Sequence, residues 1–332
     1  MSDNVLRVLG LVWLWVVCAS GSTWAQAQRY SFERALMGTS FRIVLYTSND
    51  SLAQTAASAA FERIKTLNTL LSDYLDGSEI NRLSASSGTG QWVSVSPDLF
   101  AILVVSKSIS KKTFGHFDCT VGPYVQLWRR ALRRHYFPDE ATLRSLGRRV
   151  GYRHVRISDR NQAIKLRRKG MRLDLGGIGK GYAADEALKA LRTFGIGAAL
   201  VDAGGDLTIG EAPPGQSGWK IAIPSYSETD TTETSLSLAQ VGIATSGATY
   251  RYLEHEGKRY SHIVSPKTGV GLLHHVRTTV IAPTGTLADA LATAVSVAGV
   301  ADTKRFVKRM QGVTVCLAEE HNGRITYWQA VR

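Results

Sequence analysis

A glycine-rich segment constrains the fold of this 332-residue chain most strongly. Residues 174–181 read DLGGIGKG and stand between a short apolar run and an Ala/Leu-rich stretch. This pattern predicts a tight turn from a strand into a helix over residues 181–194. A glycine turn at a helix N-terminus suits a phosphate group, because backbone N–H groups and the helix dipole both face an anion there. Taken alone, the turn is equally compatible with a plain connection between two elements.

Asp289 and Thr293 lie four residues apart in a stretch that predicts another helix, residues 286–298. Their side-chain oxygens therefore share one face of that helix. A carboxylate and a hydroxyl suit Mg²⁺, which prefers oxygen ligands. An Asp-x-x-x-Thr pair alone is more often a solvated helix face. Together with the glycine-rich turn, however, it predicts a site for Mg²⁺ and a pyrophosphate group.

Strand and helix patterns are interspersed along the chain, which predicts an α+β fold of mixed sheets with flanking helices. Predicted strands cover residues 41–46, 155–157, 163–166, 171–173, 198–201, 207–209, 219–223, 236–243, 276–282, 313–317 and 325–327. Predicted helices cover residues 52–71, 97–112, 125–132, 181–194, 286–298 and 302–310, the last with Asp302 as its N-cap. The candidate site residues fall on both sides of every plausible boundary. We therefore expect one unit, or two lobes with the site between them.

The N-terminus resembles a cleavable export signal. Arg7 precedes an apolar run over residues 8–19, which is too short to span a bilayer. The sequence Ala25-Gln26-Ala27 fits signal-peptide cleavage, so residues 1–27 are predicted to be a signal peptide and residues 28–332 the mature domain. We expect a periplasmic or otherwise exported protein. Anchoring at the inner membrane, including lipidation of Cys18, stays open.

The formal net charge of +13 is spread along the chain. Its basic clusters do not alternate with aromatic side chains, which argues against a nucleic-acid groove. The charge favours an anionic ligand or an acidic surface, with an ordinary solvated surface as the alternative. The mature segment keeps Cys119 and Cys316, which the sequence allows to be either a disulfide or two thiols.

Eight short motifs follow one another in a fixed order. They are Met37-Gly38-Thr39, Ser72-Asp73-Tyr74 with Ser78-Glu79-Ile80, Phe117-Asp118 with Thr120-Val121-Gly122-Pro123, the turn at 174–181, Gly204-Gly205-Asp206, Thr245-Ser246-Gly247, His262 with Pro266-x-Thr268-Gly269, and Ala288-Asp289-Ala290-Leu291-Ala292-Thr293. In this set and order the chain resembles the ApbE-type FAD:protein FMN transferases. The resemblance runs from about residue 37 to about residue 299. It implies a single two-lobed catalytic unit of the ApbE type over residues 28–332.

The resemblance also implies roles for individual residues. FAD contacts are implied for Met37, Tyr74, His116, Phe117, Asp118, Asp174, Lys180 and His262; metal ligands for the Gly177 carbonyl, Asp289 and Thr293; and catalytic roles for His262, as proton acceptor, and Asp289. General chemistry agrees with these roles. Met37 and Tyr74 offer soft and flat surfaces to an isoalloxazine ring. Lys180 can add a positive charge beside a pyrophosphate, and an imidazole suits proton transfer near neutral pH.

The implied reaction is Mg²⁺-dependent transfer of FMN from FAD to a Thr or Ser hydroxyl of an exported redox protein, with release of AMP. Two alternatives stay open. The same site could hydrolyse FAD to FMN and AMP, or the protein could only bind FAD in the periplasm. The implied partners are FAD, a flavin-acceptor redox protein subunit and the inner-membrane surface, with no nucleic acid. The sequence names neither the acceptor nor the oligomeric state.

Overall fold

An eight-stranded antiparallel sheet forms the centre of the protein. The computed structural model describes residues 27–223, 234–247, 252–273, 275–321 and 324–331. In spatial order the sheet contains β1 (Gln28–Leu36), β2 (Thr39–Thr47), β6 (Ala199–Ala203), β7 (Asp206–Ile209), β10 (Val241–Gly247), β13 (His275–Ala282), β14 (Thr314–His321) and β15 (Arg324–Val331). All seven pairings are antiparallel. The predicted mixed α+β architecture is confirmed.

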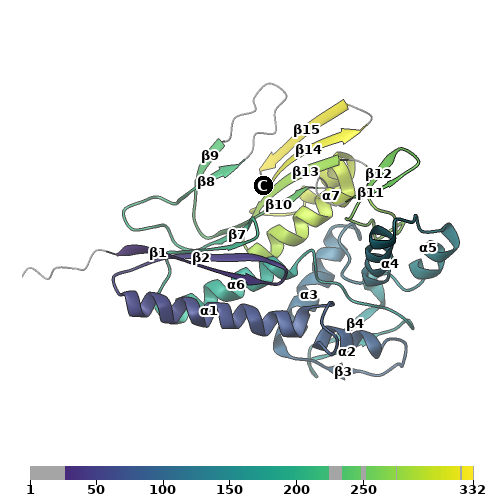
Figure 1. Cartoon of the computed structure of the whole chain (residues 1–332), viewed down its shortest axis with the longest axis horizontal. Helices are drawn as coiled ribbons and strands as arrows, with labels where there is room; N and C mark the ends of the chain where they lie inside the picture. Colours follow the sequence, from purple (N-terminus) through teal and green to yellow (C-terminus); the bar gives the residue numbers. More distant parts are fainter. Residues whose placement is uncertain (1–26, 224–233, 248–251, 274, 322–323, 332) are drawn as a thin grey trace, which may run out of the picture.

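Three helices cover one face of this sheet (Figure 1). They are α1 (Asp50–Leu71), α6 (Gly179–Thr193) and α7 (Gly285–Val307). Asn49 begins α1 as an N-cap whose side chain accepts a hydrogen bond from Leu52 N, and Thr284 does the same for α7 with Leu287 N. The buried faces of all three helices are rich in alanine. Small side chains let these helices pack closely on one another and on the sheet.

A short pair of strands, β8 (Trp219–Ile223) and β9 (Thr234–Leu238), packs against the opposite face. Trp219 is buried there against a small apolar cluster that includes Val44 and Ile209 of the main sheet. Its ring meets Tyr46 edge-on, with 5.6 Å between the ring centroids. The sheet therefore has apolar packing on both faces.

A second lobe carries a hydrophobic core of its own. It contains α4 (Gly122–Arg134), α5 (Glu140–Gly147) and the hairpin of β11 (Tyr252–His255) and β12 (Lys258–Ser261), with the fully buried Trp128 of α4 between them. The Trp128 indole N–H donates to Gly269 O at 2.5 Å. The remaining elements are α2 (Glu79–Ala85), β3 (Val93–Ser94), α3 (Pro97–Lys112), η1 (Tyr152–His154), β4 (Val155–Ser158) and β5 (Ala163–Leu166). Of these, α2, α3, β4 and β5 add buried side chains to the core of the main sheet.

Three predicted elements differ in the structure. Residues 171–173 form no strand, and only Arg172 makes an isolated bridge, to Val121. The run at 236–243 is not one strand but parts of β9 and β10, which lie in different sheets. The chain turns at Gln240, where φ is +55° and the backbone N–H donates to Gly210 O at 2.8 Å.

The third difference concerns Asp302, which does not cap the second of the two predicted helices. The two helices are present as two parts of α7, separated at Gly299, where φ is +62° and ψ is −174°. The second part begins at Val300, two residues before Asp302. The N–H of Val300, the first residue after the interruption, donates to the Glu319 carboxylate at 2.8 Å. A glutamate from β14 thus provides the cap that the sequence assigns to Asp302.

Other expectations concern the termini and cysteines. The predicted signal peptide, Cys18 included, lies outside the described residues except for Ala27. Within the part of the chain that is described, no helix has the length and apolar character needed to cross a membrane. Cys119 is buried and Cys316 half-buried, and both are free thiols.

Helices α6 and α7 cross at a point where only glycine fits. A Cβ atom at Gly181 would lie 2.2 Å from Gly285 O, so the two backbones are in direct contact. The Gly181 N–H donates to the Asp289 carboxylate at 3.0 Å. Asp185 of α6 accepts from Gly285 N at 2.7 Å and so fixes the start of α7. The crossing therefore joins the glycine-rich turn to the helix of Asp289 and Thr293.

Replacing Gly181 by alanine should destabilise the protein by about 1–3 kcal/mol, because the added methyl group overlaps the backbone of α7. Gly179→Ala is the matched control, since a Cβ there meets its nearest atoms at 3.8 and 3.9 Å. The free energy of unfolding can be measured by urea denaturation. Equal stabilities of the two variants would contradict the required contact at Gly181.

Candidate active site

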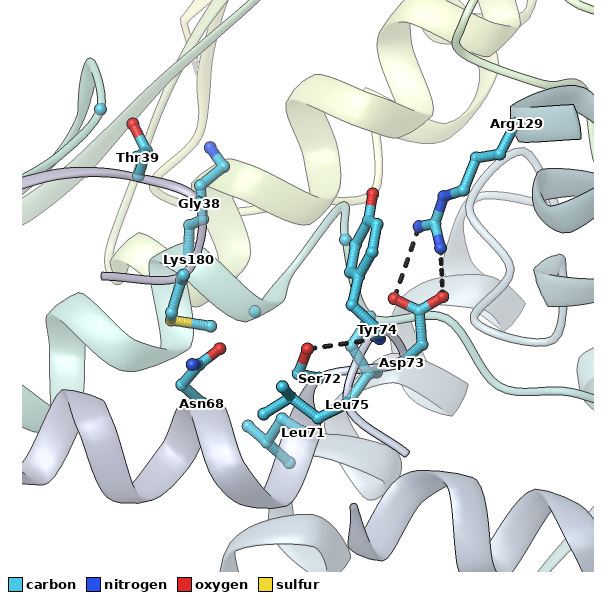
Figure 2. Close-up of a pocket in the computed structure, with 15 residues that line it drawn as sticks. Gly38, Thr39, Asn68, Leu71, Ser72, Asp73, Tyr74, Leu75, Arg129 and Lys180 are labelled. Atoms are coloured by element: carbon cyan, nitrogen blue, oxygen red, sulfur yellow. Dashed lines mark hydrogen bonds and ion pairs between the residues drawn. The ribbon is translucent and has the colours of Figure 1, made fainter. Parts of the chain in front are cut away.

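A cleft between the two lobes contains two adjoining pockets. The larger one, of about 680 Å³, is lined by Met37, Leu71 and Leu75 among others, and we call it the Met37 pocket (Figure 2). The other, of about 430 Å³, is lined by residues of both lobes, including Asp289 and Trp128, and we call it the Asp289 pocket. Tyr74, Arg129, Gly176 and Lys180 line both pockets. Two cavities of this size that share a wall can hold a ligand of several ring systems.

Tyr74 and Arg129 meet at the junction of the two pockets. The Arg129 guanidinium lies over the Tyr74 ring, with its carbon 3.9 Å from the ring centroid. Arg129 also pairs with Asp73, as Figure 2 shows, and donates to the Asp174 carboxylate at 3.1 Å. The Tyr74 side chain is 71% exposed, so one face of the ring remains available to a ligand.

Asp174 is held in place from several sides. Its backbone N–H donates to Cys119 O at 2.8 Å, and its carboxylate accepts from Gly176 N at 2.8 Å. Burial raises the pKa of Asp174, and the negative charge of the nearby Asp73 raises it further. The positive charge of Arg129 lowers this pKa but does not outweigh the other two effects. The glycine-rich turn therefore begins with a rigid, buried carboxylate that is paired with a cation.

Lys180 lies on the first turn of α6 and forms an ion pair with Asp206. Burial acts to lower the pKa of Lys180, but the carboxylates of Asp289 and Asp206 outweigh it and hold that pKa above its usual value. Lys180 thus stays charged in the cleft. The N-cap residue of α6, Ile178, provides no side-chain hydrogen bond, and the Asp289 carboxylate accepts from Gly181 N in the first turn instead. The helix N-terminus that the sequence predicts for a phosphate is therefore already bonded to a carboxylate.

Three residues whose oxygen atoms could bind a metal, Gly177, Asp289 and Thr293, line the Asp289 pocket. A Cβ at Gly177 would lie 2.7 Å from Thr293 Oγ1, so the Gly177 backbone and the Thr293 hydroxyl are neighbours. Asp289 lies one turn earlier on α7, and all three residues line the pocket. Within the described residues no group of three or more His, Cys, Asp or Glu side chains could hold a metal. A single carboxylate with hydroxyl and carbonyl oxygens fits Mg²⁺, which completes its shell with water and phosphate.

His262 is an exposed residue of the loop after β12 and lines the Asp289 pocket. Backbone hydrogen bonds fix the residues on either side of it, from Ser261 N to Leu272 O at 2.8 Å and from Leu272 N to Ile263 O at 3.0 Å. The bond from Trp128 to Gly269 ties the following turn to α4. The predicted proton acceptor therefore shares a pocket with the predicted metal ligands.

The structure does not bring His116, Phe117 and Asp118 to this cleft. All three are buried, and none lines either pocket. The Asp118 carboxylate accepts from Thr120 N at 2.9 Å and Tyr152 N at 2.8 Å, which satisfies it locally. Burial raises its pKa.

His116 Nε2 lies 3.1 Å from the Asp302 carboxylate and 3.1 Å from Lys267 Nζ. These contacts link the loop of His116 to α7 and to the turn after His262. The backbone carbonyl of Cys119, in the same loop, accepts from the N–H of Asp174. The segment therefore holds the glycine-rich turn in place without lining the cleft.

Sequence reasoning did not assign Arg129 or Asp206 to the site. Arg129 belongs to an Arg-rich stretch that reads as solvated surface, and only its contacts with Tyr74 and Asp174 reveal its position. Asp206 belongs to the motif Gly204-Gly205-Asp206, but the sequence does not indicate its ion pair with Lys180. That pair forms because the sheet places β7 beside α6. The one sequence signal for Arg129 is its position on a half-apolar face of the predicted helix at 125–132, where a positive charge is less expected than on an exposed face.

A sequence model of the ApbE family matches residues 37–317. The chain belongs to the ApbE family. Among curated proteins, the FAD:protein FMN transferase of Salmonella typhimurium strain LT2 is 30% identical over 319 residues, covering 94% of this chain and 90% of that protein. That of Escherichia coli K12 is 31% identical over 271 residues, covering 79% and 76%.

Solved structures of ApbE proteins share the fold. The ApbE protein of Thermotoga maritima is 29% identical, with a TM-score of 0.79 over 90% of this chain and 97% of that one. The apo flavinyl transferase ApbE of Pseudomonas stutzeri has a TM-score of 0.80 over 92% and 95% of the two chains, at 23% identity. The latter likeness concerns the fold alone.

If Asp289 is a ligand of Mg²⁺, binding of this ion should weaken in acid. The pKa of Asp289 is raised to about 6, mainly by burial. The charge of Lys180 lowers this pKa, and the charge of Asp206 raises it. A metal ligand must be deprotonated, so Mg²⁺ affinity should fall by about tenfold for each pH unit below that pKa. Calorimetric titration with Mg²⁺ between pH 5 and 8 measures this dependence. Asp289→Asn should bind weakly at every pH; a wild-type affinity that is constant over this range would contradict the role of Asp289.

Proposed function

We propose that this ApbE-family protein is a flavin transferase, which moves FMN from FAD to a Thr or Ser hydroxyl of an exported redox protein and releases AMP. The observation that carries the proposal is one cleft whose Asp289 pocket is lined by Lys180, Asp289, Thr293 and His262. The name FAD:protein FMN transferase, which relatives about 30% identical carry, supports it.

The Met37 pocket suits the isoalloxazine ring of FAD. Met37, Leu71 and Leu75 supply apolar surface, and the exposed face of the Tyr74 ring supplies a flat one. Arg129 on the opposite face keeps the Tyr74 ring oriented. Flavin binding then depends mainly on stacking and apolar contact.

The Asp289 pocket suits the pyrophosphate of FAD. The charge of Lys180, on the first turn of α6, attracts phosphate oxygens. Gly177, Asp289 and Thr293 would hold Mg²⁺. When bound, this ion would offset the charge that develops on the leaving AMP phosphate.

The proposed reaction is a substitution at the FMN phosphorus of FAD. The acceptor hydroxyl oxygen forms a bond to that phosphorus, and the bond from the phosphorus to the bridging oxygen breaks. AMP leaves with the bridging oxygen, and the hydroxyl proton passes to His262. An aliphatic hydroxyl is a weak nucleophile at neutral pH, so a positioned imidazole assists the attack.

Hydrolysis of FAD is the second candidate. His262 is exposed at the cleft, so water can reach the same position as an acceptor hydroxyl. We propose an exported location on the basis of the N-terminal sequence, next to an acceptor in the periplasm or at the inner-membrane surface. There the acceptor hydroxyl would compete with water.

The proposal is tested by incubating residues 28–332 with FAD, Mg²⁺ and a Thr-containing acceptor protein. Transfer gives a covalent fluorescent band on the acceptor and one AMP for each flavin bound. Hydrolysis gives AMP and free FMN with no labelled protein. Asp289→Asn should abolish both, and AMP release without any labelled acceptor would favour the hydrolase.

Tyr74→Ala should weaken FAD binding by roughly 1–3 kcal/mol, because the flavin loses its stacking surface. Tyr74→Phe keeps the ring and should retain most of the affinity. Flavin fluorescence titration gives both values. Wild-type affinity in Tyr74→Ala would exclude the ring from the flavin site.

His262→Ala should slow transfer by roughly 10²–10⁴-fold, the usual contribution of a general base. FAD affinity should change little, since a base acts mainly in the transition state. Single-turnover transfer rates and FAD titration are measured on the same preparation. A near-normal rate would show that the proton leaves by another route.

A further inference from the structure

A third cavity opens from the same junction and runs along α4. It has a volume of about 580 Å³ and is lined by Asp73, Tyr74, Gln126, Arg129, Arg130, Leu132 and Arg133; we call it the α4 groove. Tyr74 and Arg129 line this groove and both pockets of the cleft. The groove is therefore continuous with the candidate site and leads from it along the surface of the second lobe.

The α4 groove carries positive charge that the protein does not neutralise. Arg129 is occupied by Asp73 and Asp174. Arg130 and Arg133 are exposed, and within the described residues neither makes an ion pair. Guanidinium groups bind carboxylates with paired hydrogen bonds, so two unpaired arginines along a groove favour an extended, acidic ligand.

We propose that the α4 groove binds an acidic segment of the flavin-acceptor protein and guides its hydroxyl into the cleft. This inference rests on the proposed flavin transfer, which needs a protein segment to approach the FMN phosphate. The proposed function assigns the isoalloxazine ring and the pyrophosphate of FAD to the Met37 and Asp289 pockets, and the α4 groove is a further cavity that reaches the same junction. An anionic membrane surface is favoured less, because membranes are typically recognised by larger clusters of four to eight basic residues.

The test uses three Thr-containing peptides of equal length whose flanking residues are acidic, neutral or basic. The double variant Arg130→Glu/Arg133→Glu reverses the charge of the groove. Arg134→Glu is the matched control, because Arg134 is an exposed residue of the same helix that does not line the groove. Binding of dye-labelled peptides is followed by fluorescence anisotropy, separately from FMN transfer, and FAD affinity is titrated in every variant.

Wild-type protein should have a KM about tenfold lower for the acidic than for the neutral peptide, with similar kcat and a preference that declines with added salt. The double variant should lose this preference and favour the basic peptide. Arg134→Glu should behave as wild type, and FAD affinity should be the same in all proteins.

Equal KM values for the three peptides, or an equal loss in Arg134→Glu, would overturn the proposal. A second outcome would also overturn it: wild-type protein binds phosphatidylglycerol vesicles, and the double variant loses this binding while its KM for the peptides stays unchanged. The groove would then bind a membrane surface. Acid-selective binding without FMN transfer would support the groove and contradict the transferase function. The two failures are therefore distinguishable.

Discussion

The crossing of α6 and α7 is the contact on which the rest of the site depends. Gly181 and Gly285 let the two backbones touch, and Asp289 accepts a hydrogen bond from the Gly181 N–H across the contact. The carboxylate proposed for the metal is therefore bonded directly to the first turn of α6, which carries Lys180, the residue proposed to attract the phosphates. Residues about a hundred positions apart become one rigid unit, because neither helix can shift without breaking a backbone contact.

The sequence alone predicts those parts of the structure that depend on local signals. Glycines between an apolar run and a helical pattern identify the turn at 174–181, and i, i+4 spacing puts Asp289 and Thr293 on one helix face. The resemblance to the ApbE family then joins the two segments. The structure brings Met37 and His262 to the same cleft, from a β-turn and from a loop with little local pattern of their own.

Features that depend on distant contacts could not be predicted. The stacking of Arg129 on Tyr74 joins α4 to the loop after α1, and no periodicity connects them. A motif also does not reveal which side of a loop faces a cavity. The sequence motif predicts Asp118 at the FAD site, but its buried carboxylate accepts hydrogen bonds from Thr120 N and Tyr152 N. The split of the run at 236–243 requires a positive φ at Gln240, which is uncommon for a residue other than glycine.

The shared position of Tyr74 and Arg129 would couple ligands bound in different cavities. Because the pair borders the two pockets and the α4 groove, any ligand that changes the orientation of the Tyr74 ring changes the shape of all three cavities. Thermodynamic reciprocity then applies. If bound flavin orients the ring so that an acceptor binds more tightly, the acceptor must strengthen flavin binding by the same factor. The affinity of the protein for its nucleotide would then depend on whether a partner is present.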